Sequence, residues 1–242
     1  MSETCISVCQ IQKSFGGRKV VDGLSFEVKR GEVFGLLGHN GAGKSTTIDI
    51  ILGLKEPDSG STEIFHMKAL KHRKEVFKRA GVQLQQTQYQ KNITVEEACL
   101  EYSSLYEEPA DYEKLLSQFG LLTFKKNVVM KLSGGERQKL SVVLALIGKP
   151  QIVFLDELTT GLDVVARHEV WKTLHTLKEQ GLTIFLTTHY MEEAEALCDR
   201  LCIIKSGKKI VEGTPKEIME MSGQDSLENA YLFYMGEEAA LA

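Results

Sequence analysis

Apolar and polar positions in the first quarter of the chain follow the patterns of strands. Residues 5–11 and 24–28 are expected to be strands, the second with apolar side chains alternating against polar ones, as one buried face requires. Val33–Leu37 is a continuous apolar run, which is typical of a strand buried on both faces of a parallel sheet. A glycine-rich turn and a helical pattern over 44–52 follow, so this region predicts a strand, loop, helix unit.

Strand patterns nearly vanish between Thr94 and residue 149. Helical patterns over 95–106, 110–119 and 134–147 replace them. Thr94 followed three positions later by Glu97 is a capping-box pattern and supports the first of these helix starts. We therefore expect a helical insertion in an otherwise mixed chain.

Beyond residue 149, strand and helix patterns alternate. The expected elements are a strand over 152–155, a helix over 164–180, a strand over 183–187, a helix over Met191–Leu197 and a strand over 201–204. Such alternation indicates right-handed crossovers and a mainly parallel sheet. From Pro215 onward the pattern predicts two short helices, with Tyr231, Leu232 and Tyr234 packing back on the body.

The composition is that of an ordinary globular protein. The 242 residues are 43% hydrophobic and 26% charged, which excludes a disordered, collagen-like or fibrous chain. The net charge of −4 lacks the basic excess that nucleic-acid-binding proteins carry. We therefore expect no nucleic-acid partner and one domain with an inserted subdomain.

No segment predicts secretion or membrane insertion. The longest apolar run, 142–147, is far shorter than the roughly 20 residues of a membrane-spanning helix, and the first residues lack the pattern of a signal peptide. The five cysteines form no Cys-x-x-Cys pair and are expected to be small apolar residues in a reducing compartment. These features predict a cytoplasmic chain that does not span a membrane by itself.

A phosphate-binding loop, GHNGAGKS, follows the apolar strand that ends at Leu37 and opens the next helix, which is the context this motif requires. Its glycines let backbone N–H groups turn toward phosphate oxygens at a helix N-terminus. Lys44 is expected to reach the β- and γ-phosphates, and Ser45 to ligate Mg²⁺. The residues expected to hold the nucleotide here are Gly38, Asn40, Gly41, Ala42, Gly43, Lys44, Ser45 and Thr46.

Two carboxylates end the apolar strand IVFLDE, at the strand end where ligands bind in open α/β sheets. Consecutive strand side chains point in opposite directions. We therefore assign Asp156 to the magnesium shell and Glu157 to the general base that polarises water. Alone, the pair also fits two acids that merely begin a turn.

The segment LSGGE opens the helix expected over 134–147. A serine and two glycines at a helix N-terminus predict a second anion site, although an ordinary serine N-cap with flexible glycines fits the same residues. One nucleotide bound at the first loop has no evident need of this second site.

These motifs occur in the order and approximate spacing of ATP-binding-cassette (ABC) ATPases, which the chain resembles over nearly its whole length. The set comprises the phosphate loop, LSGGE, IVFLDE, TTGLD at 159–163, and the histidine in TIFLTTHYMEEAE; LSGGE is the signature of that family. The resemblance implies an α/β fold of the P-loop NTPase type, with a mainly parallel sheet core, an N-terminal antiparallel β-subdomain and an inserted α-helical subdomain. It implies one ABC ATPase domain over 1–242, with the core and β-subdomain at 1–86 and 151–214, the helical subdomain at 87–150 and a short helical tail at 215–242.

The resemblance also implies ATP and Mg²⁺ as ligands, and a second ABC ATPase subunit as partner. In the family two cassettes meet head to tail, as a homodimer or a heterodimer, and trap ATP between one subunit's phosphate loop and the other's signature. Ser133, Gly134 and Gly135 therefore resemble contacts to the γ-phosphate of the partner's ATP. Asp163 resembles the aspartate that couples the two sites.

Three further residues resemble functional positions of the family. His189 corresponds to the histidine that senses the γ-phosphate and helps to position the attacking water. Gln85 aligns best with the glutamine that reaches Mg²⁺ and this water, with Gln83 and Gln86 as alternatives. Phe15 matches the aromatic residue that stacks on adenine, because stacking needs only the ring face. The implied magnesium ligands are Ser45, Gln85 and Asp156.

Two positions depart from the family pattern. Leu158 stands where a proline usually follows the catalytic glutamate, and Glu136 stands where glutamine is commonest in the signature. Loss of a proline, which would fix the backbone, is expected to loosen the loop after Glu157. Because both carboxylates and the signature serine and glycines remain, we expect hydrolysis to survive.

The resemblance implies the ATPase subunit of a membrane transporter, peripheral on the cytoplasmic face of the cell membrane and bound to a separate transmembrane permease. The tail and the VEGTP segment at 211–215 resemble the drug, antibiotic and bacteriocin exporter branch. The alternative is a soluble ABC ATPase in iron-sulfur cluster assembly or another non-transport complex. The charged run at 68–78 fits an exposed helix or a surface near the membrane partner better than nucleic-acid binding.

Overall fold

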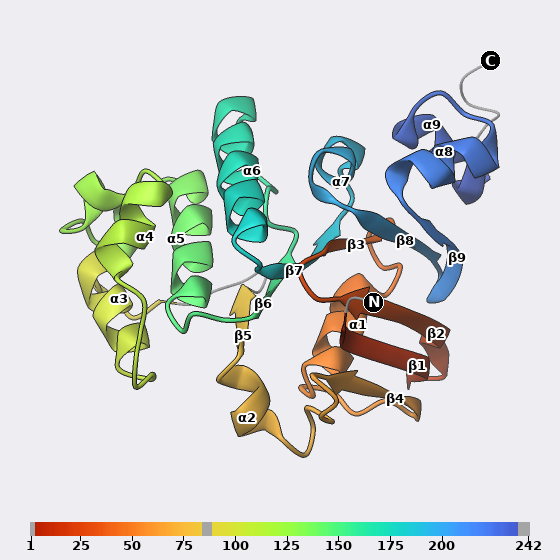
Figure 1. Cartoon of the computed structure of the whole chain (residues 1–242), viewed down its shortest axis with the longest axis horizontal. Helices are drawn as coiled ribbons and strands as arrows, with labels where there is room; N and C mark the ends of the chain where they lie inside the picture. The colour runs from red at the N-terminus through yellow and green to blue at the C-terminus, as the bar shows by residue number, and fades with distance from the viewer. Residues whose placement is uncertain (1–2, 84–88, 237–242) are drawn as a thin grey trace. The chain divides into compact units, whose positions relative to one another are not determined.

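The computed structural model describes residues 3–83 and 89–236 and is shown in Figure 1. The chain forms two compact units, one made of Met1–Val76 with Phe185–Ala242 and the other of Phe77–Ile184. Within the described ranges, no helix has both the length and the apolar character needed to cross a bilayer.

A small antiparallel sheet in the first unit contains the N-terminal strands. Its strand order is β2-β1-β4, with β1 over Thr4–Phe15, β2 over Arg18–Lys29 and β4 over Ser59–Ile64. A two-residue turn joins β1 to β2, and its residues Gly16 and Gly17 have φ of 56° and 81°. Left-handed backbone at both positions is the geometry of a type I′ turn, whose twist matches that of the flanking strands.

A second group of strands in the first unit follows the order β7-β3-β8-β9. The strands are β7 (Thr183–Thr188), which begins in the other unit, β3 (Val33–Leu37), β8 (Arg200–Lys205) and β9 (Lys208–Gly213). β3 and β8 run parallel, whereas β9 is antiparallel to β8. Two helices of this unit are α1 (Lys44–Ile51) and α7 (Met191–Leu197).

Three stacked phenylalanines join the two groups of strands of the first unit. The ring centroids of Phe26 and Phe34 lie 5.2 Å apart, and Phe185 lies 6.0 Å from the first and 5.9 Å from the second. These residues come from β2, β3 and β7, so one apolar core is shared by the antiparallel sheet and the mainly parallel one.

The C-terminal region forms two helices, α8 (Pro215–Ser222) and α9 (Leu227–Met235), as the sequence predicts. The side chains expected to pack back on the body, Tyr231, Leu232 and Tyr234, are only half-buried. The buried residues of α9 are Leu227, Ala230 and Met235. At 3.6 residues per turn, Tyr231 and Tyr234 lie on the same face of the helix as these buried residues and are partly covered there, whereas Leu232 lies off that face.

The second unit contains the parallel strands β5 (Ala80–Gln83) and β6 (Ile152–Asp156), followed in strand order by the beginning of β7. Gly81 of β5 lies against the backbone of Ala145, where a Cβ atom would overlap the Ala145 carbonyl. Glycine is therefore required at this point for the helix to approach the strand.

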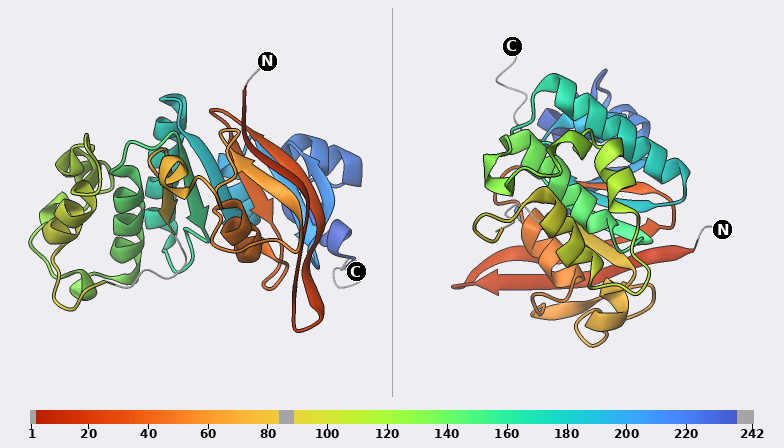
Figure 2. Two further views of the ribbon diagram at one scale, coloured as in Figure 1. Left: turned by 90° about the horizontal axis from the view of Figure 1, so that it is seen from below. Right: turned by 90° about the vertical axis from the view of Figure 1, so that its left-hand side faces the viewer.

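Helices form the rest of the second unit, and α3, α4 and α5 lie side by side in both views of Figure 2. The elements are α3 (Val95–Ser103), α4 (Tyr112–Gln118), the 3₁₀ turns η1 (Leu122–Phe124) and η2 (Val129–Lys131), α5 (Gly134–Leu146) and α6 (Val164–Glu179).

The capping box expected at Thr94 is confirmed, since its hydroxyl accepts from Glu97 N at 3.2 Å and the Glu97 carboxylate accepts from Thr94 N at 2.8 Å. Helix α2 (Arg73–Phe77) begins in the first unit, and its last residue belongs to the second. The subdomain boundaries at 87 and 150 stay a prediction.

Candidate functional site

The phosphate loop of the first unit joins β3 to α1 through two glycines in left-handed conformation. Gly41 has φ of 82° and Gly43 of 108°, a region that glycine enters without steric cost. Gly43 is also the N-cap of α1 and has no side chain to accept from the N–H groups of the first turn. Those N–H groups and the positive end of the helix dipole are suited to an anion.

Two glycines of the loop are required by close packing rather than by φ alone. A Cβ at Gly38 would lie 2.7 Å from the Ile204 carbonyl oxygen, and a Cβ at Gly43 would lie 2.6 Å from that of Val20. The backbone of the loop therefore packs against β8 at Gly38 and against β2 at Gly43. Around Gly41, by contrast, a Cβ would meet nothing within 4 Å, so this part of the loop faces open space.

Lys44 lies inside the loop with only 4% of its surface exposed. Its ammonium donates to the carbonyl of Gly38 at 2.7 Å and to that of His39 at 3.4 Å. A buried ammonium held by loop carbonyls places positive charge beside the N–H groups of the first turn. This arrangement fits the phosphate chain of a nucleotide.

The other nucleotide-binding candidates of the loop differ in exposure. Asn40 and Ser45 are exposed, Thr46 is half-buried and Ala42 is buried. The Ser45 hydroxyl is therefore open to a ligand at the helix start, whereas Ala42 serves the packing of the loop.

Phe15 ends β1 beside the two-residue turn, with 45% of its surface exposed. The ammonium groups of Lys13 and Lys55 each lie 5.7 Å from its ring centroid, within cation–π range. Lys13 pairs with Asp58 at 2.9 Å and Lys55 with Asp49 at 2.6 Å; the hydrogen bond from Lys13 lowers the pKa of the Asp58 carboxyl. No local sequence pattern indicated the contact between Lys55 and Phe15, because these residues are far apart along the chain. The Lys13–Asp58 pair was missed for the same reason, since its members are 45 positions apart.

His189 follows the fully buried strand β7 and is half-buried. Its ring centroid lies 4.2 Å from that of Tyr190, and the Tyr190 N–H donates to the Thr188 hydroxyl at 2.9 Å. The histidine therefore stands at a fixed turn between β7 and α7.

The paired acids belong to the second unit, at the end of β6. Asp156 is the last residue of this buried strand and is 4% exposed. Glu157 has left the strand and has φ of 50°, a left-handed conformation that is rare for residues other than glycine. The direction of its side chain is thus set by this turn, and the expectation from strand alternation does not apply.

Leu158, at the position where the family usually has proline, is 2% exposed and is part of the hydrophobic core. The turn continues with Thr160 N donating to the Glu157 carbonyl at 3.3 Å and Leu162 N donating to the Thr159 carbonyl at 3.1 Å. The leucine side chain therefore anchors this loop by burial instead of by a fixed φ angle.

The LSGGE segment forms the N-terminus of α5, in the second unit. Ser133 is the N-cap, and its hydroxyl accepts from Glu136 N at 3.2 Å while Glu136 Oε2 accepts from Ser133 N at 2.7 Å. A Cβ at Gly134 would meet nothing within 4 Å, whereas one at Gly135 would lie 3.0 Å from a Leu162 methyl carbon. Glu136, which departs from the family's glutamine, thus completes a capping box, and the exposed Ser133 and Gly134 face open space.

Asp163 is the N-cap of α6, and its carboxylate accepts from Ala166 N at 2.9 Å. An aspartate ahead of a helix is an N-cap signal, which sequence reasoning did not use here.

Gln85 and Gln86 lie outside the described residues. Gln83 belongs to β5, where it pairs with Leu155, and is 2% exposed.

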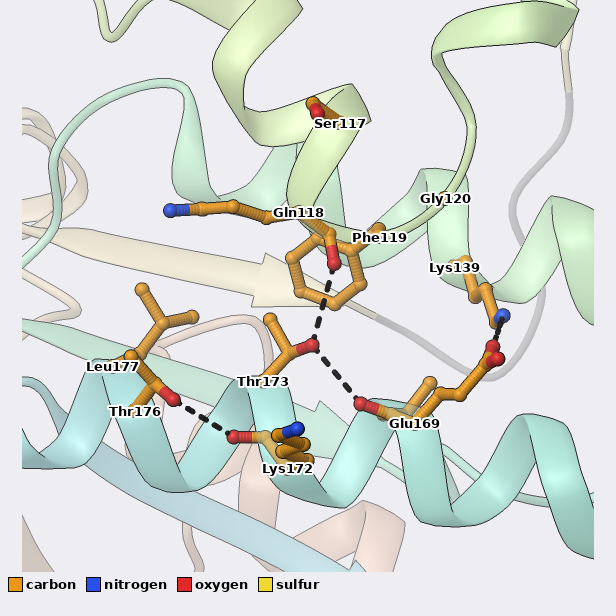
Figure 3. A pocket seen from close by; sticks show the side chains of 11 residues that line it. Ser117, Gln118, Phe119, Gly120, Lys139, Glu169, Lys172, Thr173, Thr176 and Leu177 are labelled. Carbon is orange, nitrogen blue, oxygen red and sulfur yellow. Dashed lines mark hydrogen bonds and ion pairs between the residues drawn. The ribbon is translucent and has the colours of Figure 1, made fainter.

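A cavity of about 430 Å³ in the second unit lies among α4, α5 and α6 (Figure 3). The Thr173 hydroxyl donates to the Glu169 carbonyl at 3.0 Å and to that of Gln118 at 3.4 Å, and Lys139 pairs with Glu169 at 2.7 Å. None of the residues expected to bind nucleotide lines this cavity.

Comparisons with known proteins agree on one family. A family model described as "ABC transporter" matches residues 21–160. The "Nod factor export ATP-binding protein I" of Burkholderia orbicola (strain AU 1054) is 42% identical over 225 residues, which cover 91% of this chain and 74% of that protein. The protein of the same name from Rhizobium etli (strain ATCC 51251 / DSM 11541 / JCM 21823 / NBRC 15573 / CFN 42) is also 42% identical over 225 residues, with coverage of 91% and 71%.

Solved structures show the same fold. The structure of an "ATP binding subunit of ABC transporter" superposes with a TM-score of 0.87 at 28% identity and covers 96% of this chain and 99% of that chain. The ADP conformation of an ATP-binding cassette of an ABC transporter gives a TM-score of 0.83 at 25% identity, with coverage of 98% and 100%.

Proposed function

We propose that this chain, which belongs to the ABC transporter family, hydrolyses ATP to drive export through a separate transmembrane subunit. The family assignment makes it the ABC ATPase subunit of a transporter.

The observation that carries the proposal is the buried ammonium of Lys44 within the loop that precedes α1. Positive charge, inward-turned backbone and an open helix start together suit a triphosphate. The ring of Phe15 offers an exposed face on which adenine stacks.

The residues of this chain also suit Mg²⁺. The exposed Ser45 hydroxyl and the Asp156 carboxylate would hold the ion, since Mg²⁺ takes oxygen ligands, and we assign Gln85 to the same shell. When bound, Mg²⁺ neutralises charge on the phosphate oxygens.

We assign the role of general base to Glu157. Its carboxylate accepts a proton from the attacking water, while His189 orients that water against the γ-phosphate. The left-handed backbone at Glu157 fits this role, because strained conformations cluster where a side chain must be aimed.

A second ABC ATPase subunit completes each site in our proposal. Ser133 caps α5, which begins with Gly134 and Gly135, and Ser133 and Gly134 are exposed. The N–H groups of the two glycines and the Ser133 hydroxyl are therefore suited to the γ-phosphate of a partner's ATP. Asp163, exposed at the start of α6, couples the two sites of a head-to-tail dimer.

The relatives named for Nod factor export support the exporter branch and a position on the cytoplasmic face of the cell membrane. The permease would supply the pocket for a drug, peptide or lipid-like cargo. The alternative of a soluble ABC ATPase, as in iron-sulfur cluster assembly, differs in its partners and not in its chemistry.

Affinity purification of the tagged chain from detergent-solubilised membranes tests the transport role. Wild type and Glu157→Gln are compared in Mg²⁺ and ATP, and the proteins that co-purify are identified by mass spectrometry. We expect a membrane protein with several spans in both samples, and an ATP-dependent ATPase dimer retained by the variant. Recovery of soluble partners alone would contradict transport and favour the alternative.

A further inference from the structure

One face of the segment that carries α2 is anchored to the first unit. Ala69 and Val76 are 1% and 0% exposed, and the Arg73 guanidinium donates to the Gly53 carbonyl at 2.5 Å. The backbone at Leu70 lies so close that a Cβ at Gly53 would be 2.6 Å from its nitrogen. The segment is therefore held in a fixed position.

The other face of this segment is basic. Lys71 N and His72 N donate to the Lys68 carbonyl at 2.9 and 3.0 Å, so the chain already turns as a helix does before α2 begins. Ala69 and Val76 face inward, whereas the other side chains between Lys68 and Glu75, Arg73 included, are exposed. The exposed lysines and arginine, here called the basic patch, are Lys68, Lys71, Arg73 and Lys74.

The lysines of the basic patch are not neutralised by neighbours. Across the ranges 3–83 and 89–236, neither Lys68, Lys71 nor Lys74 has an acidic partner within ion-pair distance, whereas Lys13 and Lys55 are both paired with aspartates. Residues 68–75 contain four lysines or arginines and one glutamate, a net charge of +3 in a chain of net charge −4. This concentration of positive charge favours an anionic surface as partner.

We propose that the basic patch binds the headgroups of an anionic lipid bilayer. A bilayer is favoured over an acidic protein segment because Leu70, 46% exposed among the lysines, adds an apolar side chain able to enter the headgroup region. Lysines near a negatively charged leaflet each contribute to attraction, which fades within a Debye length. The choice of partner rests on the proposed function, which places the chain beside a membrane.

Co-sedimentation with vesicles tests this inference. The purified full-length chain is mixed with vesicles of phosphatidylcholine alone, or of equal parts phosphatidylcholine and phosphatidylglycerol, at low and at physiological salt. We expect binding to the anionic vesicles only, weakened by salt. Replacing three lysines together (K68Q, K71Q and K74Q) is expected to lower the partition coefficient on the order of 100-fold.

A matched control removes the same charge elsewhere. Lys19, Lys114 and Lys216 are exposed and are paired with three different carboxylates, those of Asp22, Asp111 and Glu220. The combination K19Q, K114Q and K216Q is expected to bind anionic vesicles within about twofold of wild type, because each of these charges has an acidic partner.

Two results would overturn the lipid assignment: equal loss of binding in both triple variants, or no binding of wild type to anionic vesicles at low salt. Circular dichroism and thermal unfolding of each variant exclude loss of the fold as the cause. ATP hydrolysis is measured on the same samples. Hydrolysis without vesicle binding refutes only the basic patch, and vesicle binding without hydrolysis refutes only the proposed function.

Discussion

At the scale of single residues, the turn after β6 shows how local backbone aims a functional side chain. Glu157 takes φ of 50° while Leu158 beside it is buried, so burial of the leucine stabilises a conformation that costs of the order of 1–3 kcal/mol. The acids themselves were predictable from the apolar strand before them. The turn was not, because nothing in the letters DEL distinguishes a left-handed glutamate from a continued strand.

Phe15 gives a prediction about nucleotide affinity. Phe15→Ala is expected to raise the KM for ATP about tenfold with little change in kcat, since base stacking is worth about 1–3 kcal/mol and acts equally on ground and transition states. Phe15→Tyr keeps the ring face and is expected to match wild type. Steady-state phosphate release at varied ATP measures both, and an unchanged KM in the alanine variant would remove Phe15 from the site.

The cysteines give a second prediction at this scale. Cys9 is exposed, whereas the other cysteines are buried, and burial raises the pKa of the Cys99 and Cys202 thiols to about 12. Because the thiolate is the reactive form, titration of the native protein with Ellman's reagent is expected to modify Cys9 alone. All five cysteines should react in denaturant. Rapid modification of several thiols in the native protein would show that the described burial is wrong.

At the scale of elements, the sequence predicted long periodic segments and missed short ones. β5 has four residues, and its Gly81 serves close packing against Ala145, a requirement that no periodicity records. β4 consists mostly of half-buried or exposed small and polar side chains, and β9 is largely exposed at the end of its strand order. Such strands are specified by pairing with neighbours and not by their own pattern.

The capping box at α3 predicts the stability of the helical region. Thr94→Ala removes the hydroxyl that accepts from Glu97 N and is expected to lower the free energy of unfolding by about 1 kcal/mol. Thr123→Ala, at an exposed position, is the control and should stay within about 0.5 kcal/mol of wild type. Urea unfolding followed by circular dichroism measures both, and equal midpoints would contradict the capping role.

A second capping box makes stability depend on pH. The Glu217 carboxylate accepts from the N–H and hydroxyl of Thr214, and these bonds hold its pKa below the ordinary value of 4.5. Its stabilisation is complete above the pKa of the unfolded chain and is lost as pH falls through the lower pKa of the folded chain. Glu217→Gln should therefore lose less stability than wild type between neutral pH and pH values below 4.5.

Glu220→Gln, on the same helix, is the control. The Glu220 carboxylate is exposed, and its Oε1 lies 3.8 Å from the Lys216 ammonium. Urea midpoints are measured for the three proteins at each pH. A pH dependence in Glu217→Gln as steep as that of wild type would show that this carboxylate contributes nothing to acid sensitivity.

At the scale of the whole molecule, the candidate residues are divided between the two units. The phosphate loop, Phe15 and His189 belong to the first unit, and the paired acids, the signature and Asp163 to the second. Their order along the chain was enough to predict the family, because each motif is local in sequence. Contacts between distant segments, such as that of Lys55 with the Phe15 ring, came only from the fold.

The central claim is that this chain binds ATP at its phosphate loop and hydrolyses it with Glu157. Because binding and hydrolysis are assigned to different residues, substitutions at Lys44 and at Glu157 are expected to cause different defects. Lys44→Ala removes the buried ammonium and should abolish ATP binding, whereas Glu157→Gln should bind ATP normally and hydrolyse it on the order of 100-fold more slowly.

Release of phosphate from ATP in the presence of Mg²⁺, measured together with ATP binding for wild type, Lys44→Ala and Glu157→Gln, is the most direct test. We expect ATP binding with turnover in wild type, neither binding nor turnover in Lys44→Ala, and binding without appreciable turnover in Glu157→Gln. Turnover by Glu157→Gln at the wild-type rate, or no binding of ATP by wild type, would contradict these assignments.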